Sequence, residues 1–173
     1  RRDYCYQHRG EPGVKVILIY PMNALATDQA TRIAKLINSS KKLKGNITAG
    51  LFVGQSDHNP RMVMGPDHVI TDKDTQRQKP PDILLTNYKM LDYLLIRPKD
   101  RNLWQHNDSE TLRYLVVDEL HSFDGAQGTD LACLIRRLKA RLGTPENHLC
   151  CVGTSATLGD ASGTAALIHY ASE

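Results

Sequence analysis

Two acidic residues follow directly on an apolar run in residues 112–123, which read LRYLVVDELHSF. Asp118 and Glu119 leave this run together, and His121 follows two positions later. A carboxylate at the end of a buried strand can hold Mg²⁺, directly or through water, and the metal then bridges the β- and γ-phosphates of a nucleotide. The second carboxylate can orient or deprotonate the attacking water. The pair therefore predicts nucleotide hydrolysis, with Asp118 serving the metal and Glu119 the water.

The acidic pair could also lack any catalytic role. Asp118 and Glu119 could simply leave the sheet into solvent, with Asp118 close to the start of a helix. A histidine such as His121 is more often a packing or hydrogen-bonding residue than a catalyst. A metal site without any nucleotide is a further alternative, although the spacing lacks the i, i+4 histidine pair of helical zinc hydrolases.

A second apolar run ends in small residues in the segment 149–158, which reads LCCVGTSATL. Hydroxyl groups at a strand end can hydrogen-bond the acids of a neighbouring strand. This segment follows the acidic pair by one predicted helix, as a neighbouring strand would. We therefore expect Ser155 and Thr157 to lie beside Asp118 and Glu119 around a common hollow; an ordinary Ser/Thr-rich turn is the alternative.

Strands alternate with helices along the chain. Short apolar runs that do not alternate with polar residues predict parallel strands buried on both faces; they are 16–20, 83–86, 114–117 and 149–152, with a more mixed fifth run at 47–53. Apolar residues at helical spacing predict helices after Asn23, after Asn87 and up to Gly143. Asn23 and Asn87 are the predicted N-caps. The pattern predicts an α/β fold with a doubly wound parallel sheet.

Two segments fall outside this pattern. Residues 54–81 contain Pro and charged residues throughout and are predicted to be a long surface excursion, with one helix around 59–64. Residues 100–111 are predicted to be a second polar loop, although they contain Trp104, the only tryptophan. We find no internal repeat and no domain boundary, so residues 1–173 are expected to form one domain.

The amino-acid composition is typical of a globular protein that does not cross a membrane. Hydrophobic residues make up 40% of the 173 residues, charged residues make up 24%, and the formal net charge is +3. This charge permits a polyanionic partner without demonstrating one. The four cysteines contain no Cys-x-x-Cys pair and are interpreted as reduced, buried thiols, which favours the cytoplasm. No apolar run approaches the roughly 20 residues that a transmembrane helix needs.

With these residues in view, the chain resembles superfamily 2 helicases of the DEAD/DEAH-box (DExH) type. Residues 118–121 (DELH) resemble motif II, the DExH form of Walker B, and residues 155–157 (SAT) resemble motif III. Residues 21–29 (PMNALATDQ) resemble motif Ia, and residues 50–54 and 86–91 resemble motifs Ib and Ic. The five segments come in family order across residues 16–158, and their sequences most resemble those of the Lhr-like and Hrq1/MrfA-like prokaryotic group.

The resemblance implies a RecA-like, P-loop NTPase type of sheet that uses ATP and Mg²⁺, with the metal at Asp118. It implies that Glu119 acts on water and that His121, Ser155 and Thr157 relay the nucleotide state to the strand-binding surface. It also implies a nucleic-acid track, with DNA favoured over RNA, along five residues: Pro21, Asn23, Gly54, Thr86 and Asn87. A second RecA-like domain of the same protein is the implied partner, and no membrane is implied.

One motif of the family does not occur. No Gly-x-x-x-x-Gly-Lys-Ser/Thr, the loop that cradles the β- and γ-phosphates, is found in the 173 residues. In the family this loop precedes motif Ia by one helix, and residues 1–9 look like the end of that helix. The resemblance therefore implies a partial helicase ATP-binding domain whose sheet is incomplete because the phosphate-loop strand is missing. A catalytically inactive, helicase-like scaffold that binds nucleic acid is the alternative function.

Overall fold

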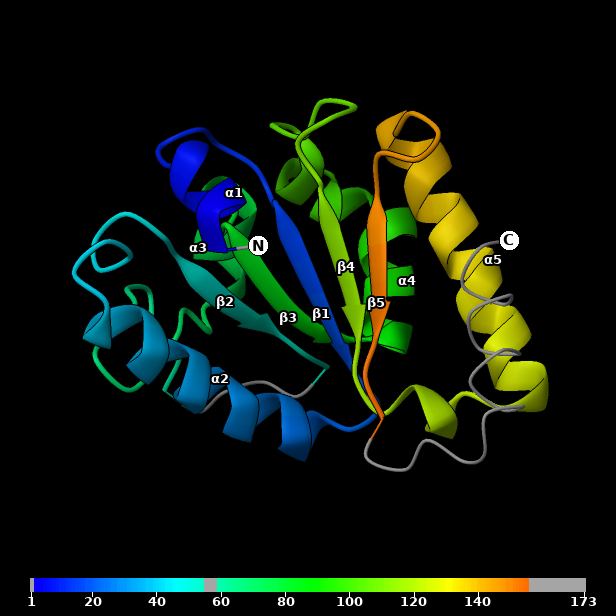
Figure 1. Cartoon of the computed structure of the whole chain (residues 1–173), viewed down its shortest axis with the longest axis horizontal. Helices are drawn as coiled ribbons and strands as arrows, with labels where there is room; N and C mark the ends of the chain where they lie inside the picture. Colours follow the sequence, from blue (N-terminus) through cyan, green and yellow to red (C-terminus); the bar gives the residue numbers. More distant parts are fainter. Residues whose placement is uncertain (1, 55–58, 156–173) are drawn as a thin grey trace.

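A single parallel sheet forms the centre of the structure, a computed structural model that describes residues 2–54 and 59–155. Its strand order is β2-β3-β1-β4-β5, with β1 in the middle (Figure 1). The strands are β1 (Val16–Tyr20), β2 (Ala49–Phe52), β3 (Ile83–Asn87), β4 (Tyr114–Val117) and β5 (Cys150–Gly153). All four ladders between neighbours are parallel. The predicted α/β class and the parallel sheet are confirmed.

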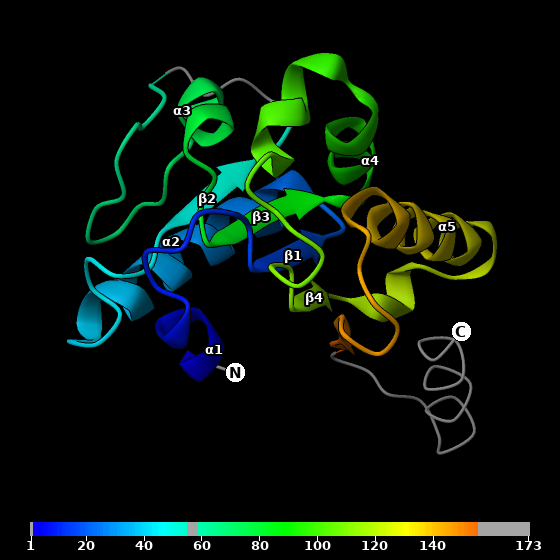
Figure 2. The ribbon, with the colours of Figure 1, turned by 90° about the horizontal axis from the view of Figure 1, so that it is seen from above.

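Helices cover both faces of this sheet, as the view from above shows (Figure 2). They are α1 (Arg2–Gln7), α2 (Asn23–Ser39), α3 (Lys73–Gln78), α4 (Tyr88–Ile96) and α5 (Gly125–Leu142), with two short 3-10 helices, η1 (Pro98–Trp104) and η2 (Leu120–Ser122). Helices α1 and α2 lie on one side, and α4, η1 and α5 lie on the other. No helix within the described ranges combines the length and the apolarity needed to cross a bilayer.

The burial of the central strand, β1, explains why its sequence does not alternate between apolar and polar residues. Ile17 and Ile19 point into the apolar cluster under α4 and α5, whereas Leu18 and Tyr20 point into the cluster under α2. Because both faces of β1 are covered, every position of the strand favours an apolar residue. Helix α5 ends as predicted at Gly143, whose positive φ of 64° suits glycine.

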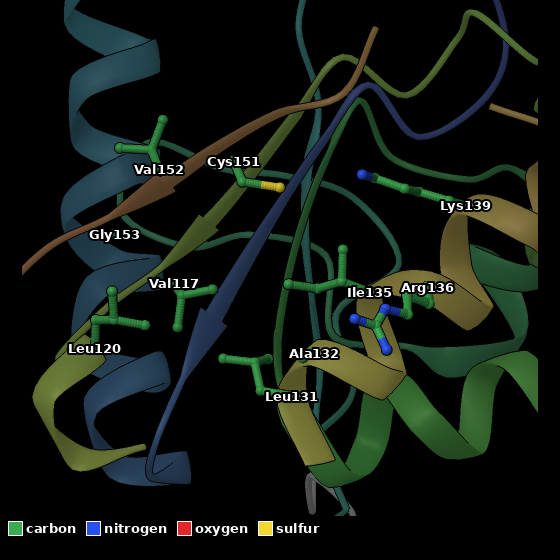
Figure 3. Close-up of a pocket in the computed structure, with 10 residues that line it drawn as sticks. All are labelled: Val117, Leu120, Leu131, Ala132, Ile135, Arg136, Lys139, Cys151, Val152 and Gly153. Carbon is green, nitrogen blue, oxygen red and sulfur yellow. The ribbon is translucent and has the colours of Figure 1, made fainter. Parts of the chain in front are cut away.

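The prediction of a fully buried last strand was wrong. Cys150 and Cys151 of β5 are half-buried, and Cys133 on α5 is exposed, so of the four thiols only Cys5 is buried. Within the described ranges β5 pairs with β4 alone and forms one edge of the sheet. An apolar hollow also remains open between β5 and α5, and Cys151 of β5 lines it together with Ile135, Arg136 and Lys139 of α5 (Figure 3).

The excursion between β2 and β3 differs from its prediction. No helix occurs at residues 59–64; instead α3 lies in the charged stretch, capped by Asp72, whose Oδ1 accepts a hydrogen bond from Thr75 N at 2.7 Å. Gln76 of α3 is fully buried and donates from Nε2 to the carbonyl oxygens of Leu51 (3.1 Å) and Ile70 (3.3 Å). This helix is therefore held by polar contacts with the sheet edge, which apolar periodicity does not reveal.

The second predicted loop is also an ordered element. Leu103 and Trp104 of η1 are buried, and Trp104 donates from Nε1 to the Leu94 carbonyl oxygen at 2.9 Å. Asp100 is fully buried, and its carboxylate lies 2.8 Å from Arg77 Nε and 3.0 Å from Arg97 Nε. The Arg77 contact is also a hydrogen bond, whereas the Arg97 contact is an ion pair without hydrogen-bond geometry. Two arginines thus neutralise one buried carboxylate that joins α3 to η1.

A buried ion pair fixes the amino-terminal edge of the sheet. Lys15, only 1% exposed, places Nζ 2.6 Å from Asp82 Oδ1 just before β1 and β3. The other carboxylate oxygen of Asp82 accepts hydrogen bonds from Thr48 N and Thr48 Oγ1, both at 2.8 Å, just before β2. Three strands are thereby joined at this edge by one carboxylate whose hydrogen-bonding capacity is well used.

Gly50 is expected to be essential for the contact between α3 and β2. A Cβ at this position would collide with the buried Oε1 of Gln76 and would lie 2.9 Å from Pro81 Cγ. Gly50→Ala should therefore lower the free energy of unfolding by about 1–3 kcal/mol, the usual cost of overpacking. Gly54→Ala is the matched control, because among the described residues its Cβ would meet only Met90 Cε, at 3.6 Å. Thermal or denaturant unfolding measures both; equal stability of the two variants would contradict the prediction.

Candidate functional site

The predicted site residues gather at one edge of the sheet, beyond the carboxyl ends of the strands. This follows from the topology, because the strands are all parallel and therefore end on the same side. Ligands of open α/β sheets bind at this edge. Two groups of residues lie there: an acidic group beyond β4 and β5, and an amide-containing group beyond β1, β2 and β3.

The acidic group depends on the register of β4 and β5. Val117 pairs with Gly153, so Asp118 and Thr154 are the next residues on the two strands. The Thr154 hydroxyl donates to Asp118 Oδ1, Thr154 N donates to Val117 O at 2.9 Å, and Leu120 N donates to Thr154 O at 2.8 Å. Of the two hydroxyl residues expected beside the acids, Ser155 lies at this junction, with its Oγ 2.9 Å from His121 Nδ1. The hydroxyl that contacts Asp118 belongs to Thr154, which sequence reasoning did not include among the site residues.

Glu119 has an unusual backbone conformation, with φ 53° and ψ 48°. A non-glycine residue in this left-handed region costs roughly 1–2 kcal/mol. The conformation turns the chain from β4 into η2, and Glu119 Oε2 then lies 3.2 Å from His121 Nδ1. The same nitrogen lies 2.9 Å from Ser155 Oγ. His121 thus contacts Glu119, which follows β4, and Ser155, which follows β5. Which of the two its Nδ1 favours depends on the tautomer. Thr157 lies outside the described residues.

Tyr20, the last residue of β1, lies close to this acidic group. Burial raises the pKa of its phenol to about 12, and the nearby Asp118 carboxylate acts in the same direction. A group with a raised pKa of this kind keeps its proton at any physiological pH. Tyr20 therefore adds no negative charge beside Asp118, and the carboxylate is not opposed by a second anion from β1.

Asn87 and Asn23 meet at the carboxyl ends of β3 and β1. Asn87 is the N-cap of α4, as predicted, and its Oδ1 accepts a hydrogen bond from Met90 N at 2.7 Å. Its Nδ2 donates to Asn23 Oδ1 at 2.6 Å. The prediction that Asn23 caps α2 was wrong: Met22 occupies the N-cap position, and Asn23 is the first helical residue. Its side chain is directed to Asn87 instead.

Thr86 is placed differently from the other predicted track residues. Its side chain is fully buried, and its hydroxyl donates to Phe52 O at 2.7 Å. The hydroxyl therefore joins β3 to β2 and is not presented at the surface. Of these two neighbouring residues, Asn87 is the one that is partly exposed and can contact a ligand at the surface.

A hollow of about 390 Å³ opens beside these residues. Three of the predicted track residues, Pro21, Gly54 and Asn87, line it. Its other lining residues were not among the predicted track residues, although the first three belong to the motif Ic-like segment 86–91; they are Tyr88, Lys89, Met90, Tyr93 and Gln127. The pattern Lys89-x-x-x-Tyr93 at the start of a predicted helix was the available signal, because residues four apart share a helix face.

The donor set around Asp118 fits the implied metal. Among the described residues, no three His, Cys, Asp or Glu side chains come together as a self-sufficient metal site. Mg²⁺ is usually held by one or two carboxylates while waters and substrate phosphates complete its octahedron. A half-buried carboxylate at a strand end, oriented by the Thr154 hydroxyl, suits this mode of binding.

Comparison with known proteins gives consistent results. The DEAD/DEAH box helicase family matches residues 4–164. Druantia protein DruE of Escherichia coli is 28% identical over 236 residues, which cover 86% of this chain and 13% of DruE. ATP-dependent helicase Lhr-Core of Methanothermobacter thermautotrophicus is 30% identical over 134 residues, which cover 77% of this chain and 14% of that protein. The chain therefore spans only a small part of the relatives that it matches.

Solved structures share the fold. The DUF1998 helicase MrfA bound to DNA and AMPPNP has a TM-score of 0.64 at 24% identity, with 92% of this chain and 19% of MrfA covered. Mycobacterium smegmatis helicase Lhr bound to ssDNA and AMP-PNP has a TM-score of 0.66 at 23% identity, again with 92% and 19% covered. The matched family, the relatives and the fold agree with the motif resemblance, and the chain belongs to the DEAD/DEAH box helicases, with similarity to the Lhr-like and MrfA-like members.

Proposed function

We propose that this chain is part of the first RecA-like motor domain of a helicase that couples Mg-ATP hydrolysis to movement along nucleic acid. The observation that carries the proposal is the junction of β4 and β5, where Thr154 contacts Asp118 and Ser155 contacts His121. Asp118 would hold Mg²⁺ against the nucleotide phosphates, and Glu119 would orient or deprotonate the attacking water. Bound Mg²⁺ would supply neutralisation of the charge that develops on the phosphates.

The same junction supports a route from the nucleotide to the nucleic acid. Asp118 N donates to Ile19 O of β1 at 2.9 Å, and Pro21 of the hollow comes two residues after Ile19, just beyond the end of β1. A shift of the strand end at Asp118 would therefore move the loop that carries Pro21. His121 would report on the nucleotide through Glu119 and pass a change to β5 through Ser155. Rigid strands with short loops suit such relays because packed elements move as units.

The hollow is the proposed entry to the nucleic-acid track. Its rim combines a glycine, an amide and a lysine, and backbone near a helix start suits phosphate oxygens. We propose DNA in preference to RNA, because the MrfA and Lhr structures hold DNA, although the similar DEAD-box helicase Mss116 holds ssRNA. The phosphate-binding loop and a second RecA-like domain would come from other parts of the intact protein, which we place in the cytoplasm.

Glu119→Gln in the full-length protein should abolish most ATP turnover while nucleotide binding persists. The amide keeps the size of the side chain but cannot accept a proton, and general-base catalysis is worth about 10²- to 10⁴-fold. Phosphate release in the presence of single-stranded DNA and binding of a fluorescent nucleotide measure the two effects. Glu146→Gln, an exposed glutamate in the turn before β5, is the control and should retain full activity. Undiminished turnover by Glu119→Gln would refute the role of Glu119.

The 173-residue chain alone should not hydrolyse ATP measurably. It contains no phosphate-binding loop motif, and the arginine fingers of a second domain can be worth roughly 10³ to 10⁵ in rate. A phosphate-release assay with single-stranded DNA tests this expectation. Magnesium-dependent turnover that Glu119→Gln removes would show that the chain is a complete catalyst.

Gly54→Ala in the full-length protein should weaken nucleic-acid binding without loss of stability. Within the part of the chain that the structure describes, its Cβ would meet only Met90 Cε, at an ordinary 3.6 Å, so the added methyl group is expected to obstruct a ligand and not the fold. Losing one hydrogen bond to a phosphate, about 1.5 kcal/mol, corresponds to about a tenfold loss of affinity. Fluorescence anisotropy with single-stranded DNA is the measurement, and Ser109→Ala, exposed at the opposite edge, is the control. Wild-type affinity of Gly54→Ala would remove this residue from the track.

A further inference from the structure

A basic and aromatic stripe runs along the outer side of α4. Lys89, Tyr93 and Arg97 are four residues apart, and the last of them is the C-cap of the helix. Side chains at i, i+4 and i+8 lie along one helix face. Lys89 and Tyr93 both line the hollow beside Asn87, so the stripe begins at the proposed track and leads away from it.

Tyr93 is exposed but held in place. Half of the residue is accessible to solvent, and the guanidinium carbon of Arg97 lies 5.0 Å from its ring centroid. Arg97 is in turn fixed by the buried carboxylate of Asp100 at 3.0 Å and by Met90 Sδ at 3.3 Å. The ring is thus supported on one side by a cation that a buried ion pair holds. A scattered surface aromatic would not require such support.

Positive charge gathers at the far end of the stripe. Burial lowers the pKa of Lys73, and the charges of Arg77, Arg97 and Lys99 lower it further. Lys73 is therefore close enough to be repelled by each of the other three cations. The carboxylates near these cations include Asp72, Asp74 and the fully buried Asp100. The repulsion between the cations would fall if a polyanion lay across them.

We propose that the outer face of α4 extends the nucleic-acid track beyond the hollow, with one base stacked on Tyr93 and backbone phosphates against Lys89 and Arg97. This inference rests on the proposed function and adds a base-contacting residue to it. Stacking on tyrosine tolerates any base, because every base has a π-face, and it suits a protein that must move along a strand. The Arg97 guanidinium lies against the ring, and the half of Tyr93 that is accessible to solvent is where the base would stack.

The first test is equilibrium binding of a fluorescent single-stranded DNA to the full-length protein. Tyr93→Ala should lose roughly 5- to 150-fold in affinity, the usual range for single base–aromatic stacks, whereas Tyr93→Phe should retain wild-type affinity because it keeps the ring. Leu36→Ala is the matched control, since Leu36 is similarly exposed at 47% on α2, away from the hollow. Thermal unfolding should be the same for the alanine variants at positions 36 and 93.

A second test locates the stacked base. A series of oligonucleotides, each with one abasic position, should reveal one register at which wild type loses affinity and Tyr93→Ala does not. Equal affinity of Tyr93→Ala and wild type, or identical abasic profiles, would overturn the stacking proposal. If Gly54→Ala still weakens binding in that case, the track itself stands and only its extension fails. If wild type binds no single-stranded DNA or RNA at all, the proposed function fails with it.

Discussion

The parallel ladder between β4 and β5 is the constraint on which the site depends. Its register pairs Val117 with Gly153, and the contacts of the acidic group beyond these two strands follow from that pairing. A slip of one residue would turn the side chains of a strand to opposite faces and separate Thr154 from Asp118. The backbone bonds of Thr154 to Val117 and Leu120 hold the register at the point where the chemistry would occur. The strain of Glu119 is tolerated because this junction fixes the chain on both sides.

Sequence reasoning succeeded where burial on both faces leaves a continuous apolar run. Strands β1, β3 and β4 could be predicted for this reason, and their parallel order is enough to place the acids and the hydroxyl residues at one edge. Helix α5 could be predicted because its apolar residues repeat at helical spacing and Gly143 supplies the left-handed cap. The last strand was also predicted, but its burial was over-predicted, because apolar residues such as Cys151 also occur where a sheet edge is only half covered.

The elements that could not be predicted are held by polar contacts between distant residues. Gln76 and Asp100 are fully buried, yet each looks like a surface residue in the sequence, because the carbonyl and guanidinium groups that satisfy them lie in other elements. Asn23 was expected to cap a helix, but a partner 64 positions away takes its side chain. Spacing likewise could not tell which hydroxyl meets Asp118, since only the strand register selects Thr154.

The ion pair of Lys15 with Asp82 places a stability determinant at the edge opposite the site. Random mutagenesis of this region should accordingly return two kinds of defective alleles. Those near Asp82 would reduce the amount of soluble protein, because removing one partner of the ion pair leaves the other charge buried and uncompensated. Those near Asp118 would leave soluble protein that has lost its chemistry. Protein abundance in a cell lysate would therefore sort the alleles by sheet edge before any assay of activity is made.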